Sequence, residues 1–287
     1  MDPILLRNLT SEQMFYIIGI TDQRGEIGAC VVNKRTRRTK LEIAVAHIHH
    51  RFGPQSLVKG KPLAALDVPA PFPHISTGFH KLDDALGIGG LPKGRVSEVM
   101  GLPTSGKTTL ALKFLAQAQA DDGQVSYIDQ ARYFDPDYAY RCGLNLSHLL
   151  VGTPYDLRET LAMAEALARN GGLSAVVLDL LDVFWTDPQV TPQLTTFLNH
   201  LPAPLARSGT AFLILHASSA QGSPALSALA HYATMRLQVV RERWLHRHGD
   251  VRGYQVQVQV LKNRLGPAGR AVTIDIEFNG TVHGDGL

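Results

Sequence analysis

The sequence predicts an α/β domain with a mainly parallel sheet, and three observations lead to this prediction. A glycine-rich loop at 101–109 stands between a predicted buried strand at 95–100 and a segment of helical character at 107–120. Further along, short apolar runs alternate with helical segments, which is the rhythm of βαβ units. After residue 230 the segments become strand-like, and 254–260 alternates strictly between polar and apolar residues. Such alternation predicts an antiparallel extension at one edge of the sheet.

The loop fits the phosphate-binding pattern G-x-x-x-x-G-K-[ST]. Its glycines let backbone N–H groups turn inward toward phosphate oxygens, and the N-terminus of the following helix favours negative charge. Lys107 is expected to reach the β- and γ-phosphates, and Thr108 is expected to bind Mg²⁺. The sequence therefore predicts a site for ATP and Mg²⁺. The expected nucleotide-binding residues in the loop are Gly101, Pro103, Thr104, Ser105, Gly106, Lys107, Thr108 and Thr109.

Residues 1–40 are expected to form an N-terminal extension. Apolar segments at 14–20 and 27–32 flank a polar stretch with a glycine, which predicts a β-hairpin. A run of five cations in seven residues follows at 34–40. Such a run suits a phosphate backbone, and a solvated linker explains it equally well.

Residues 41–73 are expected to form a helix at 41–52 and a proline-rich linker, and residues 74–287 are expected to form the core. The expected strands of the core lie at 95–100, 125–129, 148–152, 174–179, 210–216, 235–240, 254–260 and 270–278. The expected helices lie at 107–120, 135–142, 156–170 and 191–206.

Asp179 ends an apolar strand that begins at Leu173. A carboxylate at this position, downstream of a phosphate-binding loop, is typical of the residue that holds Mg²⁺ through water. Taken alone, such an aspartate is more often an ordinary strand end. The upstream loop reverses this preference and makes Asp179 the second expected metal residue beside Thr108.

Taken in order, these motifs resemble the core of the RecA/RadA recombinase family. The resemblance rests on Ile75-Ser76-Thr77-Gly78, the segment 89–95, the phosphate-binding loop, Asp135-Pro136-Asp137-Tyr138-Ala139 and Val260-Leu261-Lys262-Asn263-Arg264. It covers roughly residues 42–280 and implies a RecA-like P-loop NTPase core. The family's C-terminal domain is expected to be absent, because the chain ends soon after the last expected core strand.

The resemblance also implies roles for single residues. Asp135 and Tyr138 would contact adenine, by hydrogen bond and by stacking. Lys262 and Arg264 would extend toward the γ-phosphate bound by a neighbouring subunit, so a complete site would need a homo-oligomer or a RecA-type partner. Without the family, a basic edge strand explains these two cations as well.

The sequence departs from the family pattern where catalysis is expected. Ala131 stands where the family has the glutamate that activates the attacking water, and neither Ala131 nor the adjacent Gln130 can act as a general base. Asp129 is the nearest carboxylate. Slow hydrolysis remains possible through positioning and electrostatics. The expected catalytic residues are Lys107, Asp129, Lys262 and Arg264.

Two further departures concern the response to nucleotide and the binding of DNA. His216-Ala217 stands where the family has an Asn-Gln pair whose glutamine senses the γ-phosphate. The two DNA-binding loops of the family are short here: the stretch at 186–193 is acidic, and 217–225 lacks a cation. The usual DNA site is therefore doubtful.

Cations elsewhere are an alternative route to single-stranded DNA. One group surrounds Trp244 in a predicted hairpin, and cations interleaved with an aromatic ring bind single strands by charge and stacking. An exposed basic turn is the alternative explanation. The candidate DNA contacts are Lys34, Arg35, Arg37, Arg38, Lys40, Arg241, Arg243, Arg247 and Arg252.

Composition limits the class of protein. The 287 residues carry a formal charge of only +3, so a nucleic-acid site must be a local patch. Cys30 and Cys142 match no metal or redox spacing. No apolar run reaches the roughly 18 residues of a membrane span, and the N-terminus does not resemble a signal peptide. We expect a cytoplasmic protein without membrane contact.

Several functions are compatible with these observations. The favoured one is an ATP-binding RecA-like protein of DNA recombination or repair that hydrolyses ATP slowly, with DNA binding and assembly open. The alternatives are a nucleotide-gated regulatory scaffold without DNA binding, comparable to accessories of mutagenic repair, and an active strand-exchange recombinase. A P-loop kinase is disfavoured by the missing lid and the antiparallel C-terminal strands.

Overall fold

The chain divides into two compact units, Met1–Val68 and Pro69–Leu287, and each is described by itself. The computed structural model describes residues 17–21, 27–31, 34–54, 56–57, 72–181, 185, 187, 189–217, 222–248 and 250–278.

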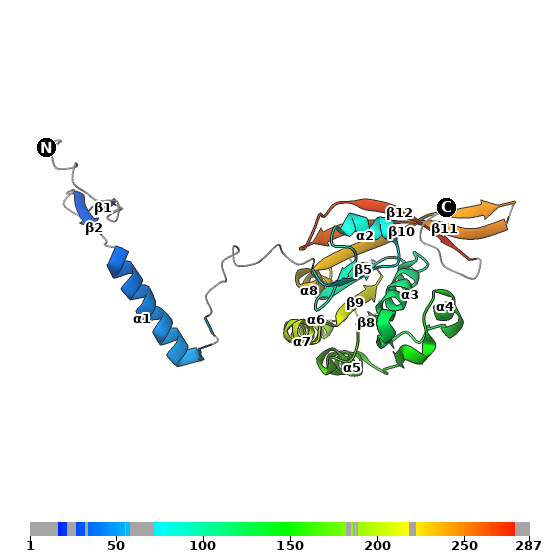
Figure 1. Cartoon of the computed structure of the whole chain (residues 1–287), viewed down its shortest axis with the longest axis horizontal. Coiled ribbons are helices and arrows are strands. Elements are labelled where there is room, and N and C mark those ends of the chain that lie inside the picture. Colours follow the sequence, from blue (N-terminus) through cyan, green and yellow to red (C-terminus); the bar gives the residue numbers. More distant parts are fainter. Residues whose placement is uncertain are drawn as a thin grey trace. The chain divides into compact units, whose positions relative to one another are not determined.

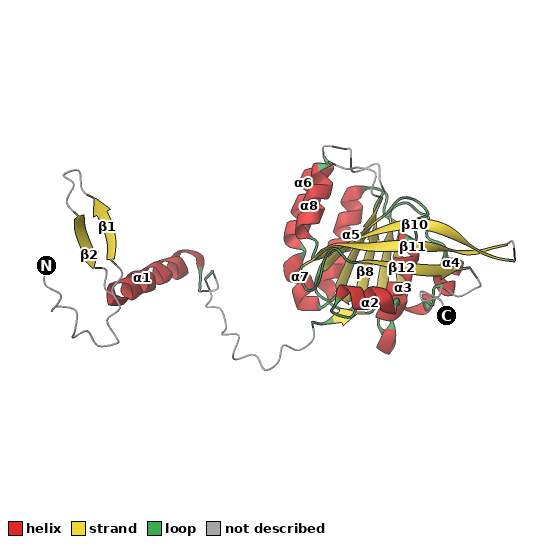
Figure 2. Cartoon of the chain, turned by 90° about the horizontal axis from the view of Figure 1, so that it is seen from above, coloured by secondary structure: helices red, strands yellow, loops and turns green. Residues whose placement is uncertain are grey.

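The first unit contains the predicted β-hairpin. Strands β1 (Ile17–Thr21) and β2 (Ile27–Val31) pair antiparallel, with Ile17 opposite Val31 and Thr21 opposite Ile27 (Figure 2). The outer parts of the predicted hairpin, residues 14–16 and 32, lie outside the described residues.

The helix of the first unit begins earlier than predicted. Helix α1 spans Lys34–Phe52, so the expected start at residue 41 is wrong and the basic run is part of the helix. Lysine and arginine are good helix formers, and Arg38 pairs with Glu42 one turn later at 3.1 Å. From Arg38 onward most side chains of α1 are exposed.

The second unit is built around an eight-stranded sheet with the order β12-β11-β10-β5-β9-β8-β6-β7 (Figures 1 and 2). All neighbours from β10 to β7 pair parallel, whereas β11 pairs antiparallel with both β10 and β12. This confirms the predicted parallel sheet with an antiparallel edge. The strands are β5 (Val96–Met100), β6 (Val125–Asp129), β7 (Leu149–Gly152), β8 (Ala175–Asp179), β9 (Ala211–His216), β10 (Met235–Arg247), β11 (Asp250–Asn263) and β12 (Ala271–Glu277). A short pair, β3 (His74–Ile75) and β4 (Leu91–Pro92), lies apart from this sheet.

Helices cover both faces of the sheet and form two hydrophobic clusters. Strand β8 shows how they separate: Ala175 and Val177 belong to one cluster, and Val176 and Leu178 to the other, because successive side chains of a strand point to opposite faces. The first cluster takes in α2 (His80–Leu86), α3 (Lys107–Ala118) and α4 (Pro136–Arg141). The second takes in α5 (Leu157–Asn170), α6 (Val190–His200), α7 (Pro202–Ser208) and α8 (Pro224–Tyr232). Short 3₁₀ helices span Ala120–Asp122 and Leu146–His148.

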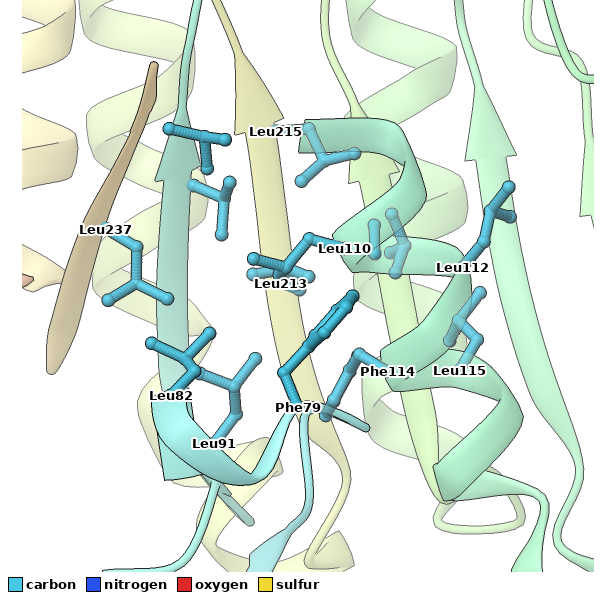
Figure 3. Close-up of a cluster of buried hydrophobic side chains, with 14 of the residues drawn as sticks. Phe79, Leu82, Leu91, Leu110, Leu112, Phe114, Leu115, Leu213, Leu215 and Leu237 are labelled. Carbon is cyan, nitrogen blue, oxygen red and sulfur yellow. The ribbon is translucent and has the colours of Figure 1, made fainter. Parts of the chain in front are cut away.

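The first cluster holds α3 against the centre of the sheet. Leu110 and Phe114 of α3 lie over Leu213 of β9, with Phe79 and Leu82 beside them (Figure 3). Phe114 and Leu213 are fully buried, and burial of such a side chain contributes about 1.5–3 kcal/mol. This packing fixes the N-terminus of α3 just beyond the end of β5, where the glycine loop lies.

The predicted helix at 191–206 is two helices. Helix α6 ends at His200 and α7 begins at Pro202, so the prediction of one continuous helix is wrong. Proline has no N–H and cannot continue the hydrogen bonds of α6, but it is well suited to the first turn of a new helix. Helix α8 was not predicted.

Strands β10 and β11 are longer than predicted, whereas β12 is one residue shorter at each end than the predicted 270–278. Strand β10 pairs parallel with β5 over Met235–Gln238 only, and its remaining residues pair with β11 alone. Strands β10 and β11 extend together beyond the rest of the sheet (Figure 2). The two strands form the predicted hairpin, in which Trp244 lies opposite Tyr254 and Arg247 opposite Asp250. The segment of this hairpin from Arg241 to Tyr254, called the hairpin arm below, extends past the end of β5 on the side of the glycine loop.

Candidate nucleotide-binding site

The glycine loop is tightly curled between β5 and α3. A Cβ atom on Gly101 would lie 2.4 Å from Ser105 Oγ and 2.6 Å from the carbonyl oxygen of Val239, so only glycine fits. Gly106 has φ +99°, a conformation that side-chain-bearing residues rarely adopt. Thr104, a β-branched residue, has φ +63°, which marks local strain.

The curl leaves the start of α3 open to an anion. Gly106 precedes the helix and provides no side-chain cap for its first N–H groups. Lys107 and Thr108 occupy the first two helical positions and are half-exposed. An open helix N-terminus, a lysine and a hydroxyl are the donor set that a Mg²⁺–triphosphate requires, so these residues fit ATP and Mg²⁺.

The parallel strands bring the predicted acidic residues to the same edge. Asp129 at the end of β6 and Asp179 at the end of β8 are direct register partners. The Tyr127 hydroxyl donates to Asp179 Oδ2 at 2.6 Å. Burial, together with the charge of Asp179, raises the pKa of Tyr127 far above its usual value, so the phenol remains a donor that orients this carboxylate.

Asp129 faces the loop that follows its own strand. Its Oδ2 accepts the backbone N–H of Phe134 at 2.7 Å, and the carboxylate is nearly fully buried. The ring of Phe134 packs on Tyr127 with 5.2 Å between centroids. The carboxylate therefore holds the loop that carries the half-buried Ala131, and a catalytic role for Asp129 remains a prediction.

The two predicted adenine residues lie at the start of α4. Asp135 caps that helix by accepting the N–H groups of Asp137 and Tyr138, at 2.9 and 3.2 Å. Tyr138 shares a 2.5 Å hydrogen bond with Thr109 Oγ1, and Tyr254 of β11 shares one at 3.1 Å with the same oxygen. The structure thus brings Tyr138 to the glycine loop and adds Tyr254, which sequence reasoning missed.

A buried carboxylate lies under the glycine loop. Glu98 of β5 accepts from Arg236 Nε at 2.6 Å and from Arg236 Nη2 at 3.1 Å, and its Oε1 lies 2.9 Å from His216 Nε2. The other ring nitrogen of His216 faces the carbonyl oxygen of Ala217 at 2.6 Å, and the His216 carbonyl accepts the N–H of Gly101 at 3.2 Å. His216 therefore uses both ring nitrogens and its carbonyl oxygen in contacts that support the glycine loop.

Lys262 and Arg264 lie at the end of β11, next to the part of β10 that pairs with β5. In the β10–β11 ladder Lys262 stands opposite Arg236, and the backbone N–H of Arg264 donates to the carbonyl oxygen of Thr234. Their side chains donate to the carbonyl oxygens of Ala230 and His231 at the end of α8, at 2.6–3.1 Å. Cations are favourable at a helix C-terminus. Burial and the nearby cations Arg264 and Arg236 lower the pKa of Lys262. The role of Lys262 and Arg264 at the γ-phosphate bound by a neighbouring subunit remains a prediction.

Comparison with known proteins decides the family. Residues 39–194 match the RecA N-terminal domain. The RecA protein of Caulobacter vibrioides (strain NA1000 / CB15N) is 32% identical over 263 residues, which cover 84% of this chain and 73% of that protein. The chain belongs to the RecA family. The RecA protein of Ruminococcus albus is 30% identical over 269 residues, which cover 86% of this chain and 67% of that protein.

A solved structure supports the fold. The crystal structure of the RadB recombinase matches 72% of this chain and 97% of its own with a TM-score of 0.58, at 22% identity. The RecA family membership confirms the resemblance found in the motifs and associates the chain with ATP binding and with recombination and repair.

The cations predicted for DNA are divided between the two units. Arg38 and Lys40 are exposed on α1, and Arg241, Arg243 and Arg252 are exposed on the hairpin arm. For Lys34, Arg35, Arg37 and Arg247 the structure describes the backbone alone. Parts of the two short loops, 182–184, 186, 188 and 218–221, lie outside the described residues.

Two features are absent from the described residues. No group of three or more His, Cys, Asp or Glu side chains there is placed to hold a metal ion. In the same part of the chain, no helix is long and apolar enough to cross a membrane.

The buried carboxylate leads to a test of stability. Burial alone would raise the pKa of Glu98, but hydrogen bonds and charges from His216 and Arg236 outweigh it and hold the pKa below its ordinary value of 4.5. Ionised Glu98 therefore stabilises the fold at neutral pH, and this contribution is lost as the pH falls below that value. We expect Glu98→Gln to lower the free energy of unfolding by about 3 kcal/mol at neutral pH, and by less near pH 3, where part of the contribution of ionised Glu98 is lost.

Urea unfolding of both proteins at the two pH values measures this difference. Glu165→Gln is the matched control, because Glu165 pairs with Arg169 at 2.5 Å on the surface of α5 and should cost less than about 1 kcal/mol. An equal loss for Glu98→Gln at both pH values would contradict the assignment of an ionised, paired Glu98.

Proposed function

We propose that this RecA-family chain is a Mg²⁺-ATP-binding protein of cytoplasmic DNA recombination or repair that hydrolyses ATP slowly and acts as a switch. The observation that carries the proposal is the open glycine loop and α3 N-terminus beside a loop in which Ala131 replaces a carboxylate. These features support a site that binds nucleotide but lacks the residue expected to activate water.

The binding half of the site has a role for each element. The loop N–H groups and the start of α3 would hold the phosphates, and Lys107 would neutralise the β- and γ-phosphates. Thr108 and Asp179 would hold Mg²⁺, with Asp179 oriented by Tyr127 at 2.6 Å. Bound Mg²⁺-ATP supplies a scissile phosphate whose developing charge the metal stabilises. Tyr138, whose hydroxyl bonds to Thr109, would contact the base.

Near the expected position of the attacking water, the described side chains have no acid–base group or already bind another part of the chain. Ala131 carries no base, and the Asp129 carboxylate binds the N–H of Phe134. Ala217 stands where the family has the glutamine that senses the γ-phosphate, and the adjacent His216 is buried and faces Glu98 and the Ala217 carbonyl oxygen. These contacts support slow hydrolysis that depends on positioning alone.

Assembly would complete the site with cations from a second subunit. Lys262 and Arg264 lie side by side at the end of β11, and both are partly exposed. A homo-oligomer or a RecA-type partner that placed this edge against the glycine loop of the next subunit would add two positive charges at the γ-phosphate. Activity per subunit would then rise with protein concentration.

Single-stranded DNA would bind through the exposed cations of α1 and of the hairpin arm. On the arm, Arg241 and Arg243 flank Trp244, whose ring is 45% exposed and offers a face for a base. The alternative is a nucleotide-gated scaffold without DNA binding. It is favoured by the fact that Arg243 already donates to Gln255 at 3.0 Å and Arg241 to Thr104 at 3.2 Å.

Loss of Lys107 tests the nucleotide site. Lys107→Ala removes a charge-assisted hydrogen bond to phosphate, which should weaken Mg²⁺-ATP binding about 10- to 100-fold. Equilibrium binding of a fluorescent ATP analogue measures the change. Lys93→Ala removes an equally charged, exposed side chain away from the loop and should leave the affinity unchanged. Equal affinity in the Lys107 variant would show that the site is elsewhere.

Restoring a carboxylate tests the switch. Ala131→Glu should raise the turnover of ATP by up to about 10²-fold, because a positioned general base contributes about 10²–10⁴-fold. Ala131→Gln has the same size without a base and should remain slow. Steady-state phosphate release at several protein concentrations measures both. Brisk wild-type turnover that Asp129→Asn abolishes would instead make Asp129 the base and remove the reason to call this chain a switch.

Salt dependence tests DNA binding. Removing one cation that binds a phosphate should lower the slope of log K against log salt by about 0.7 for a single strand. The DNA variant replaces four exposed cations with alanine: Arg38, Lys40, Arg243 and Arg252. Its control replaces four exposed cations elsewhere: Lys81, Lys93, Arg158 and Arg207. Fluorescence anisotropy of labelled oligo-dT should show a reduced slope for the first alone. No binding by the wild-type protein would favour the scaffold.

A further inference from the structure

The hairpin arm contacts the glycine loop directly through Arg241. Its Nη1 donates to Thr104 Oγ1 at 3.2 Å. The loop at 102–105 and β10 at 238–241 face each other across a pocket of about 200 Å³. The loop and the strand therefore lie close together, and Arg241 crosses the space between them.

The contact is made to the strained residue of the loop. Thr104 has φ +63°, which a β-branched residue adopts only when its surroundings hold it there. The Arg241 hydrogen bond is a side-chain contact that favours this conformation. It therefore stabilises the curl that turns the loop N–H groups toward a phosphate.

The other side of Arg241 lies on Trp244. The guanidinium carbon is 4.4 Å from the centre of the Trp244 ring, the geometry of a cation–π contact. Trp244 meets Tyr254 edge-on at 6.0 Å, and the Tyr254 hydroxyl hydrogen-bonds Thr109 at 3.1 Å. The contacts thus form a circuit from Thr104 through the arm and back to Thr109.

The circuit encloses the residues expected to hold the nucleotide. Thr104 and Thr109, its two ends, bracket Lys107 and Thr108 in the sequence. The Tyr254 ring also lies under the loop, because a Cβ atom on Gly106 would come within 3.3 Å of it. Contacts of the arm therefore reach the loop on both sides of the segment that carries Lys107 and Thr108.

We propose that Arg241 is a positioning residue that couples nucleotide occupancy of the glycine loop to the hairpin arm through Thr104 and Trp244. The inference rests on the proposed nucleotide site and not on DNA binding. Nucleotide favours the curled loop, and the curled loop favours the Arg241 bond, so each stabilises the other. A ligand that binds the arm and fixes Arg241 and Trp244 would change the affinity of the protein for nucleotide. By linkage, nucleotide would change the affinity for that ligand by the same factor.

This route is independent of His216. That side chain is 1% exposed and faces Glu98 and Ala217. The arm, by contrast, is exposed along one side and ends beside the loop. A signal from the nucleotide to the surface therefore has a contiguous path through Arg241 and Trp244.

The chain contains a natural reporter for the test. It has two tryptophans, and Trp185 lies 5.0 Å from the His216 ring, so a Trp185→Phe background leaves Trp244 as the only one. Mg²⁺ and a slowly hydrolysed ATP analogue are titrated into this protein. We expect a saturable change in Trp244 emission, with the same dissociation constant as a fluorescent nucleotide measured separately.

Variants at each end of the contact separate coupling from general damage. Arg241→Gln should abolish the emission change and weaken nucleotide binding by about 2- to 10-fold, although Arg241 is not among the residues expected to hold the nucleotide. Thr104→Val keeps the shape of the side chain and removes the acceptor, so it should also abolish the emission change. Thr104→Ser keeps the acceptor and should retain it. Arg270→Gln removes the same charge from an exposed site near α2 and should change neither measurement.

The outcomes distinguish this proposal from the nucleotide site itself. Tight nucleotide binding with a silent Trp244, or a full response in Arg241→Gln, would overturn the coupling and leave the site intact. No nucleotide binding by the wild-type protein would overturn the site, and the coupling with it. Loss of the Trp244 response in Arg241→Gln and Thr104→Val, together with a retained response in Thr104→Ser, would establish the coupling.

Discussion

The shared carboxylate of Glu98 is the contact on which the geometry of the site depends. It joins β5 to β9 through His216 and to β10 through Arg236, at the level where β5 leads into the glycine loop. Glu98 is fully buried, and an isolated buried carboxylate would be very costly. The three strands must therefore keep their alignment for the charge to remain paired. This alignment places the His216 carbonyl where it accepts the N–H of Gly101 and fixes the start of the loop.

The His216 carbonyl fixes the start of the glycine loop from the side of β9. Strand β10 and the hairpin arm shape the loop from the other side. The Val239 carbonyl approaches Gly101 so closely that no side chain fits, and Tyr254 lies under Gly106. Arg241 reaches Thr104 between these two points. Strand β10 is thus both the partner of Glu98, through Arg236, and the wall of the loop. Packing of α3 on the central strands holds the remaining end (Figure 3).

Some of this was accessible from the sequence for clear physical reasons. The rhythm of apolar runs and helical segments predicts a parallel sheet, and strand ends that share an edge bring Asp129 and Asp179 together. Periodicity, however, identifies the buried face of a strand and not the partner of a side chain. The Glu98–His216 contact joins residues 118 positions apart, and Thr109–Tyr254 joins residues 145 apart, so no local signal could reveal them. The early start of α1 has a local signal, since lysine and arginine are good helix formers. The same cluster of charges also fits a phosphate-binding run or a solvated linker, so it does not by itself indicate a helix.

Four residues, Asp129, His216, Lys262 and Arg264, share one physical feature: their side chains already make contacts within the scaffold. Asp129 binds the N–H of Phe134, and Lys262 and Arg264 bind the carbonyl oxygens of α8. His216 is fixed by Glu98. A group that moves a proton or follows a phosphate must exchange partners during the reaction, and each of these groups would first give up a contact that holds the fold. Lys107 and Thr108 are half-exposed at an uncapped helix start and face no such cost. The division favours a site that binds nucleotide readily and converts it slowly, and in such a site the energy of binding is available for changing the loop and the strand beside it.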